Sequence, residues 1–259
     1  MSRVAPLVDL RGKRGLIVGI ANEQSIAAGC GGAFRRAGAR LGATYLNDKA
    51  EPFVRPIAER LGCEFLLPCN VQNEQQFDEL FEWIASDWGS LDFLLHSIAF
   101  APTEDLHGRV VDCSASGFAT AMDVSCHSFI RMARAAEPLM AEGGCMLAVT
   151  FHGSERVVPH YSLMGPVKAA LESSVRYLAT ELGPRDIRVH AISPGPIATR
   201  AASGIEHFDE LLKAAERAPE HRRVGIEDVG NLAAFLVSDA ASCITGTVIP
   251  VDCGAHLLA

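Results

Sequence analysis

Residues 14–34, RGLIVGIANEQSIAAGCGGAF, decide the fold because they join a short apolar run to a glycine-rich helix. Gly19 permits a tight turn after the apolar run, and Ser25 stands where the residue that caps the N-terminus of a helix is expected. Glycines at 29, 31 and 32 would let that helix lie close to a sheet. Its first amides could receive a pyrophosphate. The full G-x-G-x-x-G pattern is absent, so a glycine-rich turn of an ordinary α/β protein remains the alternative.

The same alternation of apolar and amphipathic segments continues along the chain. Strands are predicted at 14–19, 40–45, 64–69, 91–98, 144–150, 187–193 and 246–251. Helices are predicted at about 25–37, 51–61, 77–88, 115–141, 161–182 and 227–238. Strands that are apolar on both faces and separated by helices indicate a parallel sheet covered on each side. Ligands of such sheets bind beyond the carboxyl ends of the strands, so chemistry is expected there.

Composition narrows the class of protein. The chain has 259 residues, 49% of them hydrophobic, without a linker-like or repetitive segment, which favours one domain over residues 1–259. A net charge of −8 argues against nucleic acid and anionic membranes as partners. No apolar run approaches the roughly 20 residues of a membrane span, and the N-terminus lacks the pattern of a signal peptide. Eight scattered cysteines without a CxxC pair suggest buried thiols in a reducing compartment, with no metal site. We therefore expect a cytoplasmic protein.

The residues after the second strand bear on the choice of dinucleotide. A dinucleotide fold usually places an acid there for the adenosine ribose, or an arginine for a 2′-phosphate. The chain reads Tyr45, Leu46, Asn47 and Asp48. Because neither 46 nor 47 is basic, NADH is favoured over NADPH, although Lys49 and Arg40 leave NADPH open.

A tyrosine and a lysine follow the fifth predicted strand. Tyr161 and Lys168 are seven residues apart, so on one helix their side chains would share a face. The spacing alone could arise by chance, but its place at a strand end, before a long apolar-faced helix, makes both residues catalytic candidates.

The chain resembles a known family. With Tyr161 and Lys168 placed after the fifth predicted strand, it resembles the short-chain dehydrogenase/reductase superfamily. The segments SIAAG, TYLNDK, HSIAFAP, YSLMGPVKAALESSVRYLATELGP, AISPGPIATRAASGI and IEDVGNLAAFLVSD are similar, more narrowly, to the bacterial triclosan-sensitive enoyl-acyl-carrier-protein reductases. The resemblance runs from about residue 10 to 254. It implies a Rossmann-type doubly wound sheet of about seven strands, with a short helical substrate lid at about 198–218.

The resemblance also implies roles for particular residues. Tyr161 would be the acid, Lys168 would hold the nicotinamide ribose, and Phe151 would take the place of a second aromatic residue near the reacting atoms. Cofactor contacts are implied at Gly19, Ala21, Ser25, Ile26, Leu46, Asn70, Val71, Ser97, Ile98, Ala99, Lys168, Pro196, Ile197 and Thr199. The acyl slot would comprise Ala101, Phe151, Tyr161, Met164, Ile205, Phe208 and Leu211. For Phe151 and for the lid and acyl residues, ordinary core packing is an equal alternative.

The chain departs from the family pattern at several positions. Ala148 stands where ketone reductases of the superfamily carry a serine, which disfavours ketone reduction. Pro166 lies five residues into the expected catalytic helix, so that helix would have to begin late. Asn70 replaces the usual aspartate, and Leu46 a common glutamine. Glu206, Asp209 and Glu210 stand where carrier-docking members tend to present bases. Either these acids are a solvated face, or the carrier docks elsewhere, or the thioester is carried by coenzyme A.

The sequence thus predicts an enoyl-thioester reductase of fatty-acid synthesis that uses NADH. The substrate would be a trans-2-enoyl group on an acyl carrier protein or coenzyme A. The resemblance further implies a homotetramer built by the segments near 115–141 and 161–182 and by the last strand. The alternatives are another short-chain reductase, acting on a carbonyl or non-carrier enoyl substrate, and a dinucleotide-binding protein without turnover.

Overall fold

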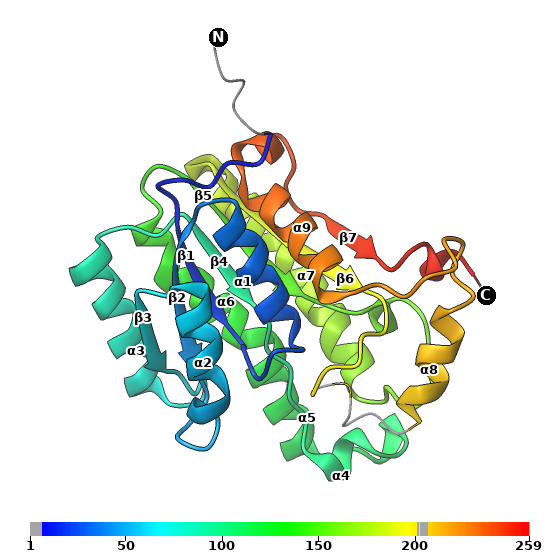
Figure 1. Cartoon of the computed structure of the whole chain (residues 1–259). Helices are drawn as coiled ribbons and strands as arrows, with labels where there is room; N and C mark the ends of the chain where they lie inside the picture. Colours follow the sequence, from blue (N-terminus) through cyan, green and yellow to red (C-terminus); the bar gives the residue numbers. More distant parts are fainter. Residues whose placement is uncertain (1–6, 201, 203–206, 259) are drawn as a thin grey trace.

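A seven-stranded parallel sheet runs through the centre of the protein, whose structure is a computed structural model describing residues 7–200, 202 and 207–258 (Figure 1). The strand order is β3-β2-β1-β4-β5-β6-β7, and every pairing is parallel. The strands are β1 Arg14–Val18, β2 Arg40–Tyr45, β3 Phe65–Pro68, β4 Phe93–His96, β5 Gly144–Val149, β6 Ile187–Pro194 and β7 Val248–Val251. Each lies inside a segment predicted to be a strand, except that β6 extends one residue further, to Pro194. The Rossmann-type, doubly wound fold is confirmed.

Helices cover both faces of the sheet. They are α1 Ile26–Arg36, α2 Glu51–Leu61, α3 Glu74–Trp83, α4 Thr103–Leu106, α5 Ala115–Met122, α6 Ser128–Ala136, α7 Met164–Leu182, α8 Phe208–Ala215 and α9 Ile226–Val237. One hydrophobic core joins α1, α2 and α9 to the sheet, and the other joins α3, α5, α6 and α7. The alternation along β1 shows why: Leu16 and Val18 enter one core, whereas Ile17 enters the other.

The predicted helix at 115–141 is broken into pieces. Between α5 and α6 lies a π-helical turn, Asp123–His127, and a short 3₁₀ turn, Glu137–Leu139, follows α6. A similar π-helical turn, Ile84–Trp88, continues α3. The sequence pattern did not indicate these turns, because a π-helical turn is a local change from i→i−4 to i→i−5 hydrogen bonding within a longer helix.

Glycines set the closest approaches in the fold. A Cβ on Gly230 of α9 would lie 2.5 Å from the carbonyl oxygen of Gly29 on α1, so the two helices cross backbone to backbone. A Cβ on Gly15 of β1 would lie 2.0 Å from the ring of Phe93 on β4, which fills that space instead. Gly29 in the glycine-rich first helix therefore serves the packing of α1 against α9, whereas the sequence suggested that these glycines bring the helix close to the sheet.

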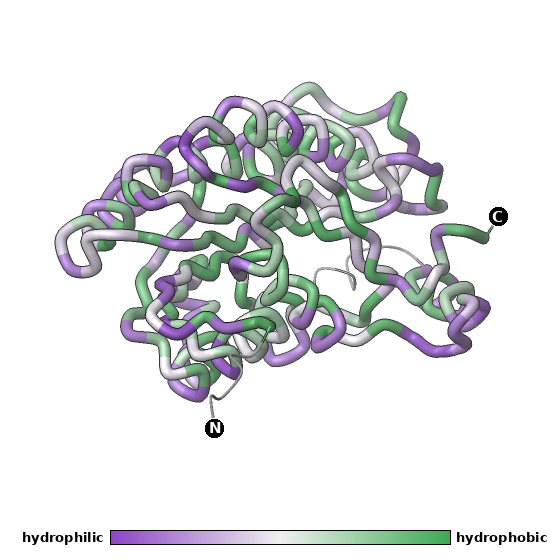
Figure 2. Tube along the Cα trace, turned by 90° about the horizontal axis from the view of Figure 1, so that it is seen from above, coloured by the Kyte–Doolittle hydropathy of each residue, from purple (hydrophilic) through white to green (hydrophobic). Residues whose placement is uncertain are grey.

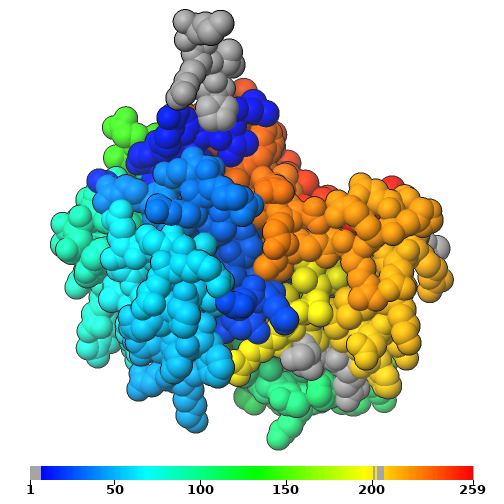
Figure 3. Space-filling view, in the orientation of Figure 1, coloured from blue at the N-terminus to red at the C-terminus, as the bar shows by residue number. Residues whose placement is uncertain are grey.

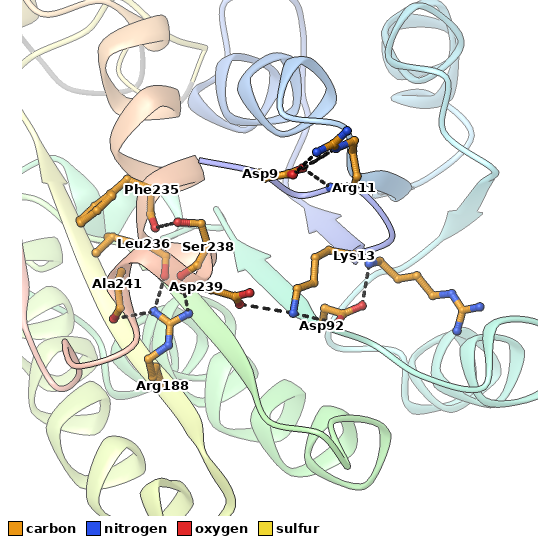
Figure 4. Close-up of polar contacts among 11 residues, drawn as sticks. Asp9, Arg11, Lys13, Asp92, Arg188, Phe235, Leu236, Ser238, Asp239 and Ala241 are labelled. Atoms are coloured by element: carbon orange, nitrogen blue, oxygen red, sulfur yellow. Dashed lines mark hydrogen bonds and ion pairs between the residues drawn. The ribbon is translucent and has the colours of Figure 1, made fainter. Parts of the chain in front are cut away.

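Polar contacts hold the end of the sheet opposite the carboxyl ends of the strands (Figure 4). Arg188 on β6 donates to the carbonyl oxygens of Leu236 in the last turn of α9 and of Ser238 and Ala241 just after it. The Lys13 ammonium lies 3.7 Å from Asp92 and 3.5 Å from Asp239. These contacts tie the starts of β1, β4 and β6 to the end of α9 and leave the opposite edge to the functional site.

Hydropathy follows the layers. Figure 2 shows hydrophobic chain through the middle of the molecule and hydrophilic chain concentrated toward its periphery. Within the described residues, no helix has the length and apolar character needed to cross a membrane.

Candidate functional site

The candidate site lies where the strand order reverses, at the carboxyl ends of β1 and β4. The Ser97 amide donates to the Val18 carbonyl oxygen at 2.9 Å, so the two strand ends are held side by side. Gly19 follows β1 with φ +112°, and a Cβ there would lie 2.1 Å from the Ser97 carbonyl oxygen. No other residue type fits this turn without displacing β4. The first predicted turn is thus placed at the topological switch point of the sheet, where such folds bind ligands.

The N-terminus of α1 opens into a cavity of about 110 Å³. Ser25 occupies the N-cap position, but its hydroxyl donates to the Asn22 carbonyl oxygen at 2.7 Å instead of capping the helix. Within the described residues, no side chain caps the first turn and no acid lies in it. The partial positive charge of the helix end is therefore available to an anion. A turn without side-chain bulk beside an uncapped helix end fits the pyrophosphate of a dinucleotide.

A larger cavity of about 360 Å³ adjoins the first. Both are lined by Ile26, Ala99, Val149, Lys168 and Thr199. The larger cavity is also lined by Phe100, Ala101, Thr103, Leu106, His107, Thr150, Phe151, Tyr161, Met164, Gly195, Pro196, Ile197, Ala202 and Phe208. In the space-filling view of Figure 3, the yellow chain that follows β6 lies between the blue segments near the N-terminus and the yellow-orange segment of α8. Lys168 thus stands where the two cavities meet.

Tyr161 and Lys168 line this cavity together, but they do not lie on one helix face. Tyr161 precedes α7, which begins at Met164, and the intervening Ser162 has a left-handed backbone with φ 43°. The expectation of a shared helical face is therefore wrong, because that backbone conformation interrupts the helix. The late start also accommodates Pro166: it is the third residue of α7, within the first turn, where backbone amides have no partner inside the helix.

The ring of Tyr161 is fixed by packing. Its centroid lies 4.9 Å from that of Phe151, with the ring planes at 58°. A Cβ on Gly153 would lie 2.4 Å from the ring, so this glycine makes room for the tyrosine. Phe151 is partly buried, packs against the core and also lines the cavity, which are the two alternatives that the sequence left open.

Burial sets the ionisation of both groups. Burial raises the pKa of the Tyr161 phenol, and the negative charge of Glu172 raises it further, so the phenol stays protonated at neutral pH. Burial lowers the pKa of Lys168 to about 8, against the opposing effect of Glu172. The Lys168 ammonium donates to the Val149 carbonyl oxygen at 2.7 Å, which holds it at the end of β5. The cavity therefore presents a neutral phenol and a cation that is still charged near neutral pH.

Comparisons with known proteins identify the family. A family model described as enoyl-(acyl carrier protein) reductase matches residues 19–256. The chain belongs to the enoyl-(acyl carrier protein) reductase family. The enoyl-(acyl-carrier-protein) reductase (NADH) FabI of Rickettsia felis is 45% identical over 250 residues, 96% of this chain and 96% of the relative. That of Nostoc sp. is 47% identical over 256 residues, covering 97% and 99%.

Solved structures of the family agree with the fold. The enoyl-(acyl-carrier-protein) reductase (NADH) of Aquifex aeolicus superimposes with a TM-score of 0.93 at 44% identity, covering 98% of this chain and 99% of that one. The Anaplasma phagocytophilum reductase, solved in complex with NAD, gives a TM-score of 0.92 at 44% identity, with 99% and 97% covered.

Most residues predicted for the site line the two cavities of this family member. The smaller cavity is lined by Gly19, Ala21, Ser25, Ile26, Ser97, Ile98, Ala99, Lys168 and Thr199, and the larger by Ala101, Phe151, Tyr161, Met164, Pro196, Ile197 and Phe208. Leu46, Asn70 and Val71 line neither cavity as the described residues delimit them. They follow β2 and β3, on the side of β1 where an adenosine would extend. Their assignment stays a prediction.

The lid helix α8 borders two neighbouring cavities. Phe208 lines the larger acyl cavity, and Leu211 lines an adjoining cavity together with Ala214 and Ala215. Phe208 and Leu211 are three residues apart and lie on the same side of the helix, so the acyl contact of Leu211 stays a prediction. Ile205 lies outside the described residues. The lid acids Asp209 and Glu210 are exposed on α8, whereas Glu206 also lies outside the described residues.

One basic residue that the sequence offered for a 2′-phosphate is already paired. Arg40 pairs with Glu64 at 2.6 Å at the start of β2, the strand end opposite the cofactor edge, so it is not available to a 2′-phosphate.

Thr150, Thr103 and His107 line the cavity without having been predicted. Thr150 follows an apolar strand directly, and that position was the available signal. Among residues 7–200, 202 and 207–258, no three His, Cys, Asp or Glu side chains are grouped to hold a metal ion.

Proposed function

We propose that this protein transfers hydride from NADH to the β-carbon of a trans-2-enoyl thioester in fatty-acid synthesis, with an acyl carrier protein as the carrier. The observation that supports this most is the buried phenol of Tyr161 beside the charged Lys168, in one apolar cavity continuous with a dinucleotide groove. The names of the relatives, which are NADH-dependent enoyl-(acyl-carrier-protein) reductases, agree with it.

NADH fits the residues of the groove. Gly19 and the start of α1 would hold the pyrophosphate, and Ser97, Ile98 and Ala99 would lie along the cofactor. Lys168 would bind the ribose hydroxyls of the nicotinamide half, and Ile197 and Thr199 its carboxamide. When bound, the dinucleotide supplies the hydride. Because Leu46 and Asn47 offer no cation to a 2′-phosphate, NADH is favoured over NADPH.

Tyr161 stabilises the charge that develops during reduction. Addition of hydride at the β-carbon leaves enolate charge on the thioester oxygen, and a neutral phenol donates a hydrogen bond to that oxygen. The Lys168 ammonium strengthens this donor by its positive charge. Phe151 orients the phenol through ring contact and supplies no polar group of its own. Phe208 and Met164 form apolar walls for the acyl chain.

The environment of β5 disfavours carbonyl reduction. Ala148 is fully buried and offers no hydroxyl at the position where ketone reductases carry a serine. Thr150 has a hydroxyl at the cavity, but that hydroxyl donates to Glu172 at 2.6 Å. The substrate oxygen would thus meet Tyr161 without a second hydroxyl donor from β5, an arrangement suited to an enolate held by one phenol.

We further propose a cytoplasmic homotetramer in which residues 1–259 form one domain with a lid at about 198–218. Cys30, Cys69, Cys126 and Cys145 are buried free thiols, which suits a reducing compartment. Aromatic side chains exposed on α5 and α7 suit the contact between subunits.

NADH oxidation tests the proposed reaction. We expect turnover with crotonyl-coenzyme A and with a crotonyl carrier protein, and much slower turnover with acetoacetyl-coenzyme A. Equal activity with the carbonyl substrate would contradict the assignment, and NADH binding without turnover of any enoyl thioester would favour a binding protein. The ratio of kcat/KM for the two enoyl thioesters distinguishes a carrier-protein substrate from a coenzyme A substrate.

A further inference from the structure

Glu172 is a buried carboxylate that the proposed reaction does not use. It lies on α7, one turn after Lys168, and is only 5% exposed. Residues four apart on a helix lie on the same face, so this carboxylate belongs to the face that presents Lys168 to the cavity. A carboxylate is costly to bury unless it is hydrogen-bonded or paired with a charge.

Two hydroxyls satisfy this carboxylate, and both come from one loop. The Thr150 hydroxyl donates to Glu172 Oε1 at 2.6 Å, and the Ser154 hydroxyl donates to the same oxygen at 2.6 Å. These residues flank Phe151, whose ring contacts Tyr161. Gly153, against which the tyrosine ring packs, lies between them as well. One carboxylate oxygen thus fixes both ends of the segment that positions Tyr161.

The charge of Glu172 acts on Lys168 across the same face. The other titratable groups near this ammonium are Cys126 from the π-helical turn after α5, His96 from β4 and the Tyr161 phenol. Burial lowers the pKa of His96 to about 3 and raises that of Cys126, so both are uncharged at neutral pH. Among the described residues around Lys168, Glu172 is therefore the group that supplies negative charge.

We infer that Glu172 is a positioning residue that links the two halves of the site, clamping the 150–154 segment behind Tyr161 through Thr150 and Ser154 while keeping Lys168 cationic for the cofactor ribose. The inference rests on the proposed function. It assigns two separable effects to one side chain. Loss of the charge should act on the cofactor, and loss of the hydroxyl contacts should act on the enoyl substrate.

The charge is tested by NADH binding without any enoyl substrate. NADH is titrated by its fluorescence from pH 6.5 to 9.5 with wild type, Glu172→Gln and Glu181→Gln. Glu181 is an exposed carboxylate on the same helix, so its change controls for loss of one negative charge from α7. Wild-type affinity should fall above about pH 8 as Lys168 loses its proton. In Glu172→Gln this fall should begin at lower pH, raising Kd about 3- to 10-fold at pH 8 and less than about twofold at pH 6.5.

The clamp is tested by Ser154→Ala, which removes one hydroxyl from a partly buried position and leaves the carboxylate. We expect the KM for crotonyl-coenzyme A to rise about 2- to 5-fold, with the Kd and pH profile of NADH unchanged. This variant keeps the inference testable if Glu172→Gln fails to fold, which circular dichroism would show. A general loss of structure would move both constants at every pH, so the split between them separates positioning from structural support.

The outcomes distinguish this inference from the proposed function. If wild type binds NADH and the midpoint of the pH profile is the same in Glu172→Gln, the charge role is refuted. An unchanged KM in Ser154→Ala refutes the clamp. If wild type binds no NADH, the proposed function itself fails, whatever the variants do.

Discussion

Tyr161 and Lys168 line one cavity but act on different molecules in the proposed reaction. Tyr161 would meet the substrate oxygen, whereas Lys168 also lines the smaller cavity proposed to hold the dinucleotide. Each residue owes its charge state to burial, which keeps the phenol neutral and brings the pKa of the lysine down to about 8. Their substitutions should therefore be kinetically distinct.

We predict that Tyr161→Phe lowers kcat by about 10- to 10⁴-fold, because the hydrogen bond to the enolate oxygen is lost. The Kd for NADH should stay near that of wild type, since the phenyl ring still packs against Phe151 and Gly153. Lys168→Ala should weaken NADH binding and turnover together. Steady-state kinetics and NADH titration measure both effects. Full activity of Tyr161→Phe would mean that another group is the acid.

His96 should make the stability of the protein depend on pH in the acid range. Its ring is fully buried, Nε2 lies 2.7 Å from the Ser128 hydroxyl, and burial lowers its pKa to about 3. The unfolded chain takes up this proton near pH 6.5, so the folded state loses stability as pH falls from about 6.5 toward 3. Between pH 7 and 5, the free energy of unfolding of the wild type should fall by about 2 kcal/mol more than that of His96→Gln. Each pKa unit is worth about 1.4 kcal/mol.

Urea unfolding at one protein concentration measures this difference. His190 adds a change of the same sign, since its pKa is lowered to about 4, but it is present in both proteins. His127→Gln, at an exposed histidine, is the control for loss of an imidazole from the chain. If wild type and His96→Gln lose the same stability between pH 7 and 5, His96 does not govern this range.

At the residue scale, the sequence reveals site residues that stand in a local pattern. It does not reveal contacts between residues that are far apart in the chain. Gly19 could be found because it ends a recognisable apolar run, Tyr161 because Lys168 follows it at a telling spacing, and Ser97 because its segment resembles the family. The Glu172 contact could not be found, because Thr150 lies 22 residues away and their approach depends on how β5 meets α7. The sequence also does not show which of two neighbouring cavities each residue of α8 lines, and Leu211 lines the one beside the acyl cavity.

At the scale of elements, the five inner strands are predictable because they are buried on both faces, which requires apolar residues at nearly every position, whereas the edge strands β3 and β7 are only partly buried. The ends of helices are less predictable than the strands. The start of α7 at Met164 depends on positive φ angles at His160 and Ser162, for which those residue types give no clear signal. That irregular backbone turns Tyr161 into the cavity that Lys168 reaches from the helix.

The crossing of α1 and α9 gives a prediction at this scale. Gly230→Ala should lower the free energy of unfolding by about 1 to 3 kcal/mol, because its Cβ would lie 2.5 Å from the Gly29 carbonyl oxygen and force the helices apart. NADH binding should weaken too, since α1 carries the phosphate end of the groove. Gly32→Ala on α1 is the matched control: its Cβ would meet only the end of Arg36 at 3.4 Å, so it should be neutral or stabilising. Equal effects of the two changes would contradict the close crossing.

For the whole molecule, the open question is what covers the apolar surface of α5 and α7. Phe118 on α5 is 41% exposed and Tyr177 on α7 is 70% exposed, on the face of the sheet that these helices cover. Aromatic side chains are enriched at the cores of protein interfaces, and closed symmetric assemblies are common among soluble enzymes. This surface supports the homotetramer that the family resemblance implies.

Light scattering tests the assembly. Wild type at micromolar concentration should have a mass near four times the 27.7 kDa of one chain. Phe118→Asp and Tyr177→Asp should lower that mass, because a carboxylate would be buried without a partner in the interface. Phe53→Asp is the control, since Phe53 is also exposed but lies on α2, on the other face of the sheet. A wild-type mass near 28 kDa would refute the tetramer. Dissociation by Phe53→Asp but not by the other two changes would move the interface to the α1 and α2 side.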